Sequence, residues 1–270
     1  MAMEKDLQRD AFREDSTRAE SAQTGWKRAA GVLLPIFSLP GRYGIGGFGE
    51  EAFRFADFLS ESRQSYWQIL PLGPTGYGDS PYQSFSTFAG NPYFIDLPTL
   101  IREGLLTEEE CEEAGLEEGA EEREGEKEDG SGELSEPERR ISYERQYRFR
   151  YPLLRKAYAR FQRGLCGEES WEAERESYQE FLQEEELWLP DYAAFMAKKS
   201  GDSEDFHCFL QYEFRKQWMR LKRYVNEKGI ELIGDIPIYV SQDSSDLLSD
   251  PKLFQPGLGI RLTASEIIKA

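Results

Sequence analysis

Three short apolar runs along the chain predict buried strands. They lie at residues 31–37 (GVLLPIF), 66–72 (YWQILPL) and 231–240 (ELIGDIPIYV), and each is bounded by Gly, Pro or polar residues. Between the first two runs, residues 49–61 place Ala and Phe side chains at helical spacing behind an acidic first turn, which predicts an amphipathic helix. Strand, helix and strand in this order form a β-α-β unit, so we expect the α/β class with a parallel sheet.

Amphipathic helices fill most of the chain between the second and third apolar runs. Aromatic and aliphatic residues repeat at helical spacing in residues 147–161, 171–198 and 205–228, and Gly229 stands where the last helix should end. Side chains in such stripes are more often packed between helices than used to bind ligands. We therefore interpret residues 101–200 as a mostly helical insertion.

The composition is that of a globular protein with a sizeable core. Hydrophobic residues make up 39% of the 270 residues, and no stretch approaches the ~18 consecutive apolar residues of a membrane span. Residues 1–27 are polar and lack the apolar segment of a secretory signal, so we expect a flexible leader and a cytoplasmic protein without membrane contact. Cys111, Cys166 and Cys208 are widely spaced, which favours free thiols over a disulfide framework or a zinc site.

The net charge of −18 is concentrated in one segment. Residues 108–138 hold 16 Asp and Glu residues against two Lys and Arg residues, so the rest of the chain carries only a small net charge. These carboxylates show no spacing that would bring them together on a metal ion, and we interpret the run as a solvated, disordered insertion. Phosphate binding needs a basic face, which argues against nucleic acid as a partner. No protein partner is implied.

Gly44, Gly46 and Gly49 fit the pattern G-x-G-x-x-G between a predicted strand and a predicted helix. A dinucleotide fingerprint should begin directly after the strand, and an acidic residue should close the next strand about 20 residues on. Here residues 38–44 intervene, and the second apolar run ends in Leu-Pro-Leu. A nucleotide-dependent oxidoreductase stays an alternative, but we expect these glycines to turn the backbone beside a substrate groove.

The loop after the second apolar run carries the main candidate site. It is almost uncharged and interleaves Gly and Ser with aromatic residues, an arrangement suited to presenting aromatic faces to a ligand. The alternative is a loop whose aromatic residues pack on their own domain. The aromatic residues are Tyr77, Tyr82, Phe85, Phe88 and Tyr93.

A second candidate is Asp235, which stands inside the third apolar run, where a carboxylate is costly unless it is paired or used. The alternative is a buried Asp satisfied by the backbone or by an Arg. Asp243 and Asp246 follow in a polar loop, where a helix cap or a turn is the expected role. In (β/α) barrels the active site lies at the carboxyl ends of the strands, which is where these residues fall.

Three blocks of sequence, in the same order, resemble the amylomaltases, which are bacterial 4-alpha-glucanotransferases. The blocks are RAAGVLLPIFSLPGRYGIGGFG from residue 28, LPLGPTGYGDSPYQSFSTFAGNPYFID from residue 70 and GIELIGDIPIYVSQDSSD from residue 229. The resemblance covers roughly residues 28–255. It implies the N-terminal part of a (β/α)8 TIM barrel, with about three of the eight strands and a mostly helical insertion.

The resemblance also implies a function: transfer of α-1,4-glucan segments between maltodextrins by a retaining double displacement. At the matching positions, Tyr82 and Asp235 would contact sugar near the scissile bond. Ser80 would donate a hydrogen bond in the same region, and Tyr77 would stack against glucan further out. Maltodextrins and other α-1,4-glucans are the expected partners, and no metal or organic cofactor is implied. A non-catalytic α-glucan-binding module is the alternative from another class.

In the family that the chain resembles, the nucleophilic Asp and the acid/base Glu come after the third strand, so we assign no catalytic residue to this chain. The residues from 256 onwards no longer resemble the family. We expect a truncated, inactive form whose open sheet edges make it marginally stable or prone to aggregation. The expected organisation is a leader (1–27), two strands with the substrate loop (28–100), the helical insertion with its acidic run (101–200), a helix with the third strand (201–255) and a divergent tail (256–270).

Overall fold

The computed structural model describes residues 28–75, 80–115, 141–167, 169–237 and 239–254. The predicted leader and the divergent tail lie outside the described residues. The chain divides into two compact units, residues 1–30 and residues 31–270, and every element below belongs to the second. The strands are β1 (Gly31–Leu33), β2 (Tyr66–Gln68), β3 (Gln83–Ser84), β4 (Glu231–Ile233) and β5 (Tyr239–Val240).

Helices make up most of the described structure. They are α2 (Glu50–Glu61), α3 (Leu97–Arg102), α4 (Glu108–Glu113), α5 (Tyr143–Arg145), α6 (Tyr151–Gly167), α7 (Glu172–Glu184), α8 (Leu189–Ser200), α9 (Glu204–Glu227) and α10 (Ser245–Ser249). A π-helical segment, Gln146–Arg150, joins α5 to α6. Short 3-10 turns cover Ile36–Ser38, Pro92–Phe94, Glu169–Trp171 and Pro251–Leu253.

Three parallel strands form the main sheet, in the order β1, β2, β4. Gly31 lies opposite Tyr66, and Tyr66 lies opposite Glu231. The α/β class with a parallel sheet is confirmed, but each strand has three residues and is shorter than its apolar run. Pro35 has no N–H for the ladder and is followed directly by a 3-10 turn, which ends the first strand early.

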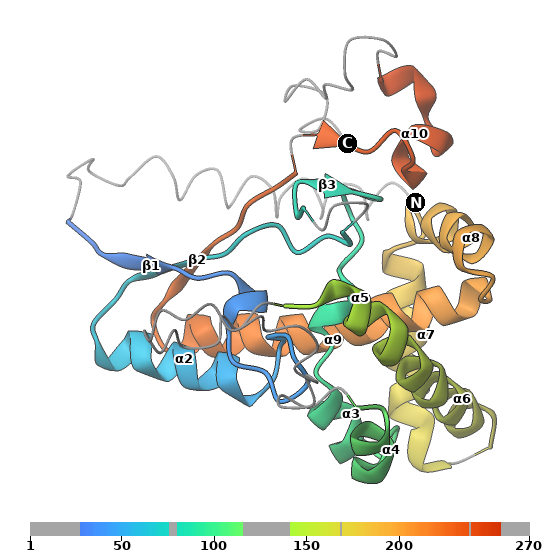
Figure 1. Cartoon of the computed structure of the whole chain (residues 1–270), viewed down its shortest axis with the longest axis horizontal. Helices are drawn as coiled ribbons and strands as arrows, with labels where there is room; N and C mark the ends of the chain where they lie inside the picture. Colours follow the sequence, from blue (N-terminus) through green and yellow to red (C-terminus); the bar gives the residue numbers. More distant parts are fainter. Residues whose placement is uncertain (1–27, 76–79, 116–140, 168, 238, 255–270) are drawn as a thin grey trace, which may run out of the picture. The chain divides into compact units, whose positions relative to one another are not determined.

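The two faces of this sheet differ in burial, because side chains alternate along a strand. Trp67 is fully buried, donates from Nε1 to the Leu34 carbonyl at 2.8 Å and contacts the ring of Phe55 on α2. Leu33 and Ile233 point to the opposite face and are 54% and 41% exposed. Helices α2 and α9, which pack against each other, cover the Trp67 face (Figure 1).

Helix α9 begins and ends within one residue of the boundaries that the sequence pattern predicted. Ser203 caps its start by accepting the Phe206 N–H at 3.2 Å. Gly229 follows its end with a φ of 78°, the left-handed conformation that suits glycine. The prediction of a helix over residues 205–228 is therefore confirmed. Its buried hydrophobic residues include Phe206, Phe209, Leu210, Leu221 and Val225.

Two buried glutamines on α9 hold the segment that follows the aromatic loop. Gln211 accepts the Gly90 N–H at 2.7 Å and donates to the Gly90 carbonyl at 2.9 Å. Gln217 accepts the Asp96 N–H at 2.7 Å. A Cβ at Gly90 would lie 2.2 Å from the Phe214 ring, so the backbone can approach the helix this closely only at glycine. Both ends of residues 90–96 are thus fixed against α9.

The helices of the insertion pack against α9 through aromatic rings. The ring of Phe161 on α6 lies 4.9 Å from the ring of Phe209 on α9 and 5.2 Å from that of Tyr178 on α7. Edge-on and tilted ring pairs of this kind stabilise helix contacts beyond simple burial. The interpretation of the aromatic stripes as helix packing is confirmed, except that Tyr147 is 62% exposed.

The acidic run begins as an ordered helix, which corrects the expectation of disorder for its first residues. Thr107 and Glu110 form a capping box at the start of α4. Arg160 on α6 donates two hydrogen bonds to the Glu110 carboxylate, at 2.6 and 3.0 Å. Hydrogen bonding to Arg160 lowers the pKa of Glu110 to about 2. Residues 116–140, which contain the rest of the run, lie outside the described residues.

Replacing Gln211 with Met should destabilise the fold, because this change keeps the side-chain volume but leaves the N–H and the carbonyl of Gly90 buried without partners. We expect the free energy of unfolding to fall by about 2–4 kcal/mol, measured by urea denaturation. Asn226→Ala removes an exposed amide from the same helix and should change that free energy by less than about 0.5 kcal/mol. Equal losses in the two variants would contradict the role of Gln211.

The contact between Glu110 and Arg160 should make stability depend on pH in the acid range. Because the folded-state pKa of Glu110 is lowered from 4.5 to about 2, the contact stabilises the fold above pH 4.5 and is lost as the pH falls towards 2. Glu110→Gln should therefore flatten the fall in the melting temperature across this range. Glu113→Gln changes an exposed residue of the same helix and should keep the wild-type slope. A Glu110→Gln profile parallel to the wild type would refute the pairing.

Candidate functional site

Two loops meet beyond the carboxyl ends of β2 and β4. Their backbones pair as the short parallel ladder β3–β5, in which Gln83 lies opposite Tyr239 and Ser84 lies opposite Val240. The Ser241 N–H extends this contact by donating to the Ser84 carbonyl at 3.3 Å. Figure 1 shows β3 and α10 on the side of the main sheet away from α2 and α9. In parallel α/β sheets, ligands bind at this carboxyl edge.

The paired loops bring together two of the predicted site residues, Tyr82 and Asp235. The Tyr82 hydroxyl donates a hydrogen bond to Asp235 Oδ2 at 2.8 Å. This hydrogen bond raises the pKa of the Tyr82 hydroxyl, because the ionised form would lose the donor and face a carboxylate. Tyr82 is 40% exposed and Asp235 is half-buried, so a ligand can reach the pair.

The position of Asp235 corrects the interpretation of the third apolar run. The strand β4 ends at Ile233, and Asp235 lies in the irregular segment that follows it. Pro237 cannot donate a ladder hydrogen bond. The apolar run therefore extends beyond the end of the regular strand pairing. Within the described ranges, the hydrogen-bond partner of the Asp235 carboxylate is the Tyr82 hydroxyl, and neither an Arg nor the backbone takes that place.

Ser80 lies in the turn that leads into β3. Its Oγ accepts the Tyr82 N–H at 3.4 Å, and its carbonyl accepts the Gln83 N–H at 3.2 Å. Ser80 therefore shapes the turn that presents Tyr82, while its hydrogen bond to a sugar stays a prediction. Tyr77, the fourth predicted residue, lies outside the described residues.

The aromatic residues of the loop divide between presentation and packing. Phe88 is 61% exposed and Tyr82 is 40% exposed, as expected for rings offered to a ligand. Phe85 packs beneath Lys199, whose Nζ lies 4.5 Å from the centre of the ring, and Tyr93 is half-buried. Tyr82 fits the ligand-binding interpretation of the loop, and Phe85 and Tyr93 fit the packing alternative. Phe88 combines the two, because its exposed ring also stacks against Trp188 with the ring centres 6.0 Å apart.

Asp246, which the sequence pattern did not predict as a site residue, links the same two segments. Its carboxylate accepts the backbone N–H of Thr87 at 2.7 Å and the hydroxyl of Ser86 at 3.3 Å. The expected role was a helix cap or a turn, but Ser244 caps α10 by accepting the Leu247 N–H, and Asp246 lies in the first turn of that helix. No local spacing could have indicated this contact, because its two sides lie 159 residues apart in the sequence.

The glycines of the G-x-G-x-x-G pattern, Gly44, Gly46 and Gly49, lie in a loop that packs on the protein itself. A Cβ at Gly46 would lie 2.2 Å from the Ile36 carbonyl oxygen, and a Cβ at Gly49 would lie 2.1 Å from Asp96 Oδ1. A pyrophosphate at the start of α2 would meet the Asp96 carboxylate and be repelled by it. The geometry therefore favours a packing role for these glycines over dinucleotide binding.

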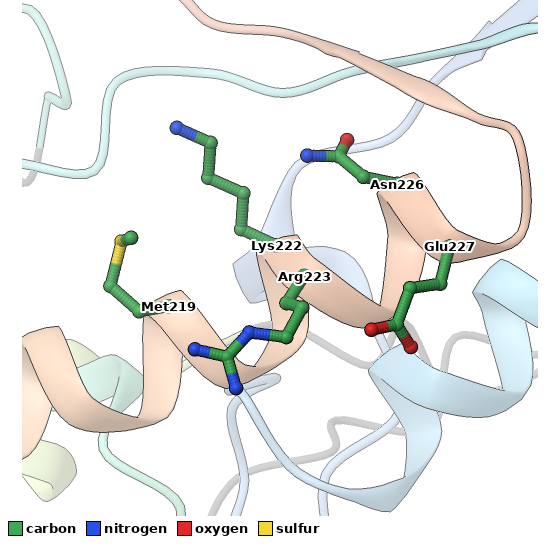
Figure 2. Close-up of a pocket in the computed structure, with 5 residues that line it drawn as sticks. All are labelled: Met219, Lys222, Arg223, Asn226 and Glu227. Carbon is green, nitrogen blue, oxygen red and sulfur yellow. The ribbon is translucent and has the colours of Figure 1, made fainter.

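A hollow of about 410 Å³ lies beside α9, and all five of its lining residues belong to that helix. Figure 2 shows Lys222 and Asn226 pointing to one side of the helix and Arg223 and Glu227 to the other. Since these side chains do not converge on a common point, the hollow offers no assembled binding site. The fifth lining residue is Met219.

The side chains that join the two loops carry hydroxyl and carboxylate groups. In the described ranges, no three His, Cys, Asp or Glu residues gather in a way that could hold a metal ion. The cysteines are free thiols, of which Cys111 is buried, Cys208 half-buried and Cys166 exposed. Among the described helices, none combines the length and the apolar character needed to cross a membrane.

A parallel β-α-β sheet with a Tyr–Asp pair on its carboxyl-end loops defines an α/β protein whose candidate site lies at the edge where ligands usually bind in this class. A comparison with protein families makes this more specific. Residues 34–205 and 198–259 match the model of glycoside hydrolase family 77, described as 4-alpha-glucanotransferase. Because the match extends over most of the sequence, the chain belongs to this family.

Individual relatives agree with this assignment. A 4-alpha-glucanotransferase of Clostridium butyricum is 41% identical over 250 residues, which are 82% of this chain and 46% of that protein. One from Thermus thermophilus is 38% identical over 84% of this chain and 46% of its own length. The structure of the amylomaltase from Streptococcus agalactiae in complex with acarbose is similar with a TM-score of 0.69 and 38% identity, over 84% of this chain and 47% of that one. The chain thus spans about half the length of the relatives it matches.

Proposed function

We propose that the chain supplies the first strands and part of the substrate groove of a (β/α)8-barrel 4-alpha-glucanotransferase, which moves α-1,4-glucan segments between maltodextrins. The observation that carries this proposal is the 2.8 Å hydrogen bond between Tyr82 and Asp235 at the carboxyl ends of β2 and β4. Membership of the family supports it, as does the similarity to a Streptococcus agalactiae amylomaltase whose structure contains acarbose.

The reaction of such an enzyme is a retaining double displacement. A carboxylate attacks the anomeric carbon, and the glycosidic oxygen leaves with a proton from a carboxylic acid. The 4-hydroxyl of an acceptor sugar then displaces the carboxylate and returns a proton to the acid/base. Each step exchanges one C–O bond for another, so no oxidant or reductant enters the balance. Water must be kept from competing with the acceptor, which requires an enclosed groove.

In this reaction we assign binding roles to the side chains of the two loops. The Asp235 carboxylate would accept hydrogen bonds from sugar hydroxyls, and the Tyr82 hydroxyl would hold that carboxylate in a fixed orientation. The exposed rings of Tyr82 and Phe88 would pack against the apolar faces of glucose units. Ser80 would donate a hydrogen bond near the scissile bond, and Tyr77 would stack against glucan further out.

We further propose that these 270 residues bind glucan without turning it over. They cover 46% of the Clostridium butyricum relative, and the nucleophile and the acid/base of the family are expected after the third barrel strand. A groove without that pair of carboxylates cannot carry out a double displacement. Further strands of a complete barrel would also cover Leu33 and Ile233, which are exposed on the described sheet.

The second candidate function is a non-catalytic α-glucan-binding module. The observation that favours it is that Tyr82 and Asp235 form a binding pair in the described loops, where we assign no nucleophile. The two candidates share the same groove and differ in chemistry. They are separated by the activity of a longer chain that carries the rest of the family sequence, because a module would stay inactive there.

Binding is tested by titrating the chain with maltoheptaose in a calorimeter. Tyr82→Ala should weaken the affinity by at least about tenfold, because it removes a stacking surface and the partner of Asp235. Tyr147→Ala is the control, since this tyrosine is 62% exposed and lies outside both loops. A wild-type chain that binds no maltoheptaose would refute the proposed groove.

Turnover is tested by incubating the same chain with maltotriose and analysing the sugars formed. We expect neither glucose nor longer maltodextrins, because the carboxylates of the double displacement are assigned beyond the third strand. Formation of either product would mean that carboxylates within these residues, Asp235 first among them, carry out the chemistry. The assignment of a binding role alone would then be wrong.

A further inference from the structure

Asp246 joins the loop after β2 to the loop after β4 through both oxygens of its carboxylate. Oδ2 accepts the backbone N–H and the hydroxyl of Thr87, at 2.7 and 2.5 Å. Oδ1 accepts the Ser86 hydroxyl at 3.3 Å. All three of these donors belong to the loop after β2, and hydrogen bonds to an ionised carboxylate are stronger than those between neutral groups.

The Ser86 side of this contact is buried and fully engaged. Ser86 is 1% exposed, and its Oγ also accepts the N–H groups of Phe88 and Ala89, at 3.2 and 3.3 Å. Because these two N–H groups occupy the lone pairs, the hydroxyl proton is directed to Asp246. Displacing the carboxylate would leave a buried donor without a partner, which is costly. The contact is therefore a fixed point of the loop.

The same two loops carry the Tyr82–Asp235 hydrogen bond on the other side of the β3–β5 ladder. Tyr82 comes just before β3 and Thr87 after it, while Asp235 comes before β5 and Asp246 after it. Each of these strands has two residues, and so short a ladder specifies its register weakly by itself. Side-chain hydrogen bonds on both sides of the ladder therefore determine how the loops align.

We propose that Asp246 is a positioning residue of the site, which sets the alignment of the two loops and keeps the Tyr82 hydroxyl on the Asp235 carboxylate. It does so from Thr87 and Ser86, without touching the ligand. The effect of Asp246 on the Tyr82–Asp235 hydrogen bond is inferred from the geometry of the loops alone. The effect on glucan binding rests in addition on the proposed function.

The state of the Tyr82–Asp235 hydrogen bond can be followed directly, because it raises the pKa of the Tyr82 hydroxyl. The measurement is the 13C chemical shift of the phenolic carbon in a chain with labelled tyrosine, titrated with base. Tyr82→Phe identifies the signal by removing it from the titration. Asp235→Asn removes the carboxylate, so the pKa of Tyr82 in this variant is the reference value for a broken hydrogen bond.

We expect Asp246→Asn to lower the pKa of Tyr82 in the same direction, although Asp246 does not contact Tyr82. Asparagine has one acceptor oxygen and turns an N–H group towards donors, so it cannot hold both Thr87 and Ser86. Asp243→Asn is the matched control, because it removes the same charge three residues earlier in the segment after β5, where Asp243 pairs with Lys199. Equal values in the two variants would show a simple charge effect and overturn the proposal.

Two substitutions at Thr87 keep the proposal testable if Asp246→Asn does not fold. Thr87→Val removes the hydroxyl that donates to Asp246 and should lower the pKa of Tyr82. Thr87→Ser keeps that hydroxyl and should restore the wild-type value. If the threonine side chain served only for packing, the pKa of Tyr82 would not depend on whether residue 87 carries a hydroxyl. The same pKa of Tyr82 in both variants would overturn the positioning role.

Titration with maltoheptaose separates this inference from the proposed function. We expect Asp246→Asn to weaken binding by at least about tenfold, because misplacement of binding groups by a fraction of an ångström is costly, and Asp243→Asn to leave it unchanged. If the wild type binds no maltoheptaose but its Tyr82 signal still responds to Asp246→Asn, the proposed function is refuted and the positioning role holds. Wild-type affinity together with an unchanged Tyr82 signal in Asp246→Asn would overturn the positioning role alone.

Discussion

The side chain of Gln211 on α9 binds both the N–H and the carbonyl of Gly90, and it does so in the buried interior. A buried polar group is stable only where all its hydrogen bonds are made, so this arrangement permits one position of the backbone at Gly90. Gln217, also a buried glutamine of α9, accepts the N–H of Asp96. The segment that follows the loop, residues 90–96, is therefore fixed against α9 at both of its ends.

With its carboxyl end fixed in this way, the loop after β2 can meet the segment after β4 in a defined alignment. The contacts between them are polar: the two-residue ladder, the Tyr82–Asp235 hydrogen bond and the Asp246 carboxylate on Thr87. The hydrophobic core under Trp67 supplies stability on the other face of the sheet. The fold thus separates a stabilising face from the side that carries the polar contacts of the candidate site, at the edge where ligands bind in α/β proteins.

The helices were predicted well, and the strands were predicted too long. Local signals define a helix, such as the acidic first turn of α2 and the Gly229 that follows α9, because its hydrogen bonds join nearby residues. A strand ends where its backbone pairing with another segment ends. The length of an apolar run indicates how much of the segment is buried, which is a different property. Asp235 was therefore placed inside a strand although β4 stops at Ile233. Glu110, at the start of the acidic run, is ordered by Arg160, and charge density alone could not indicate that partner.

The sequence by itself determined the class of fold, the helical character of most of the chain between β2 and β4 and the family resemblance, and it predicted Tyr82 and Asp235 as site residues. These follow from local pattern and from motifs whose residues are close together in the chain. Only the tertiary structure decided which groups meet: Tyr82 with Asp235, 153 residues away, and Thr87 with Asp246, 159 residues away. It also decided that Phe85 packs while Phe88 is presented to solvent. The physical reason is that hydrogen bonds and burial depend on distance in space, which periodicity and composition do not encode.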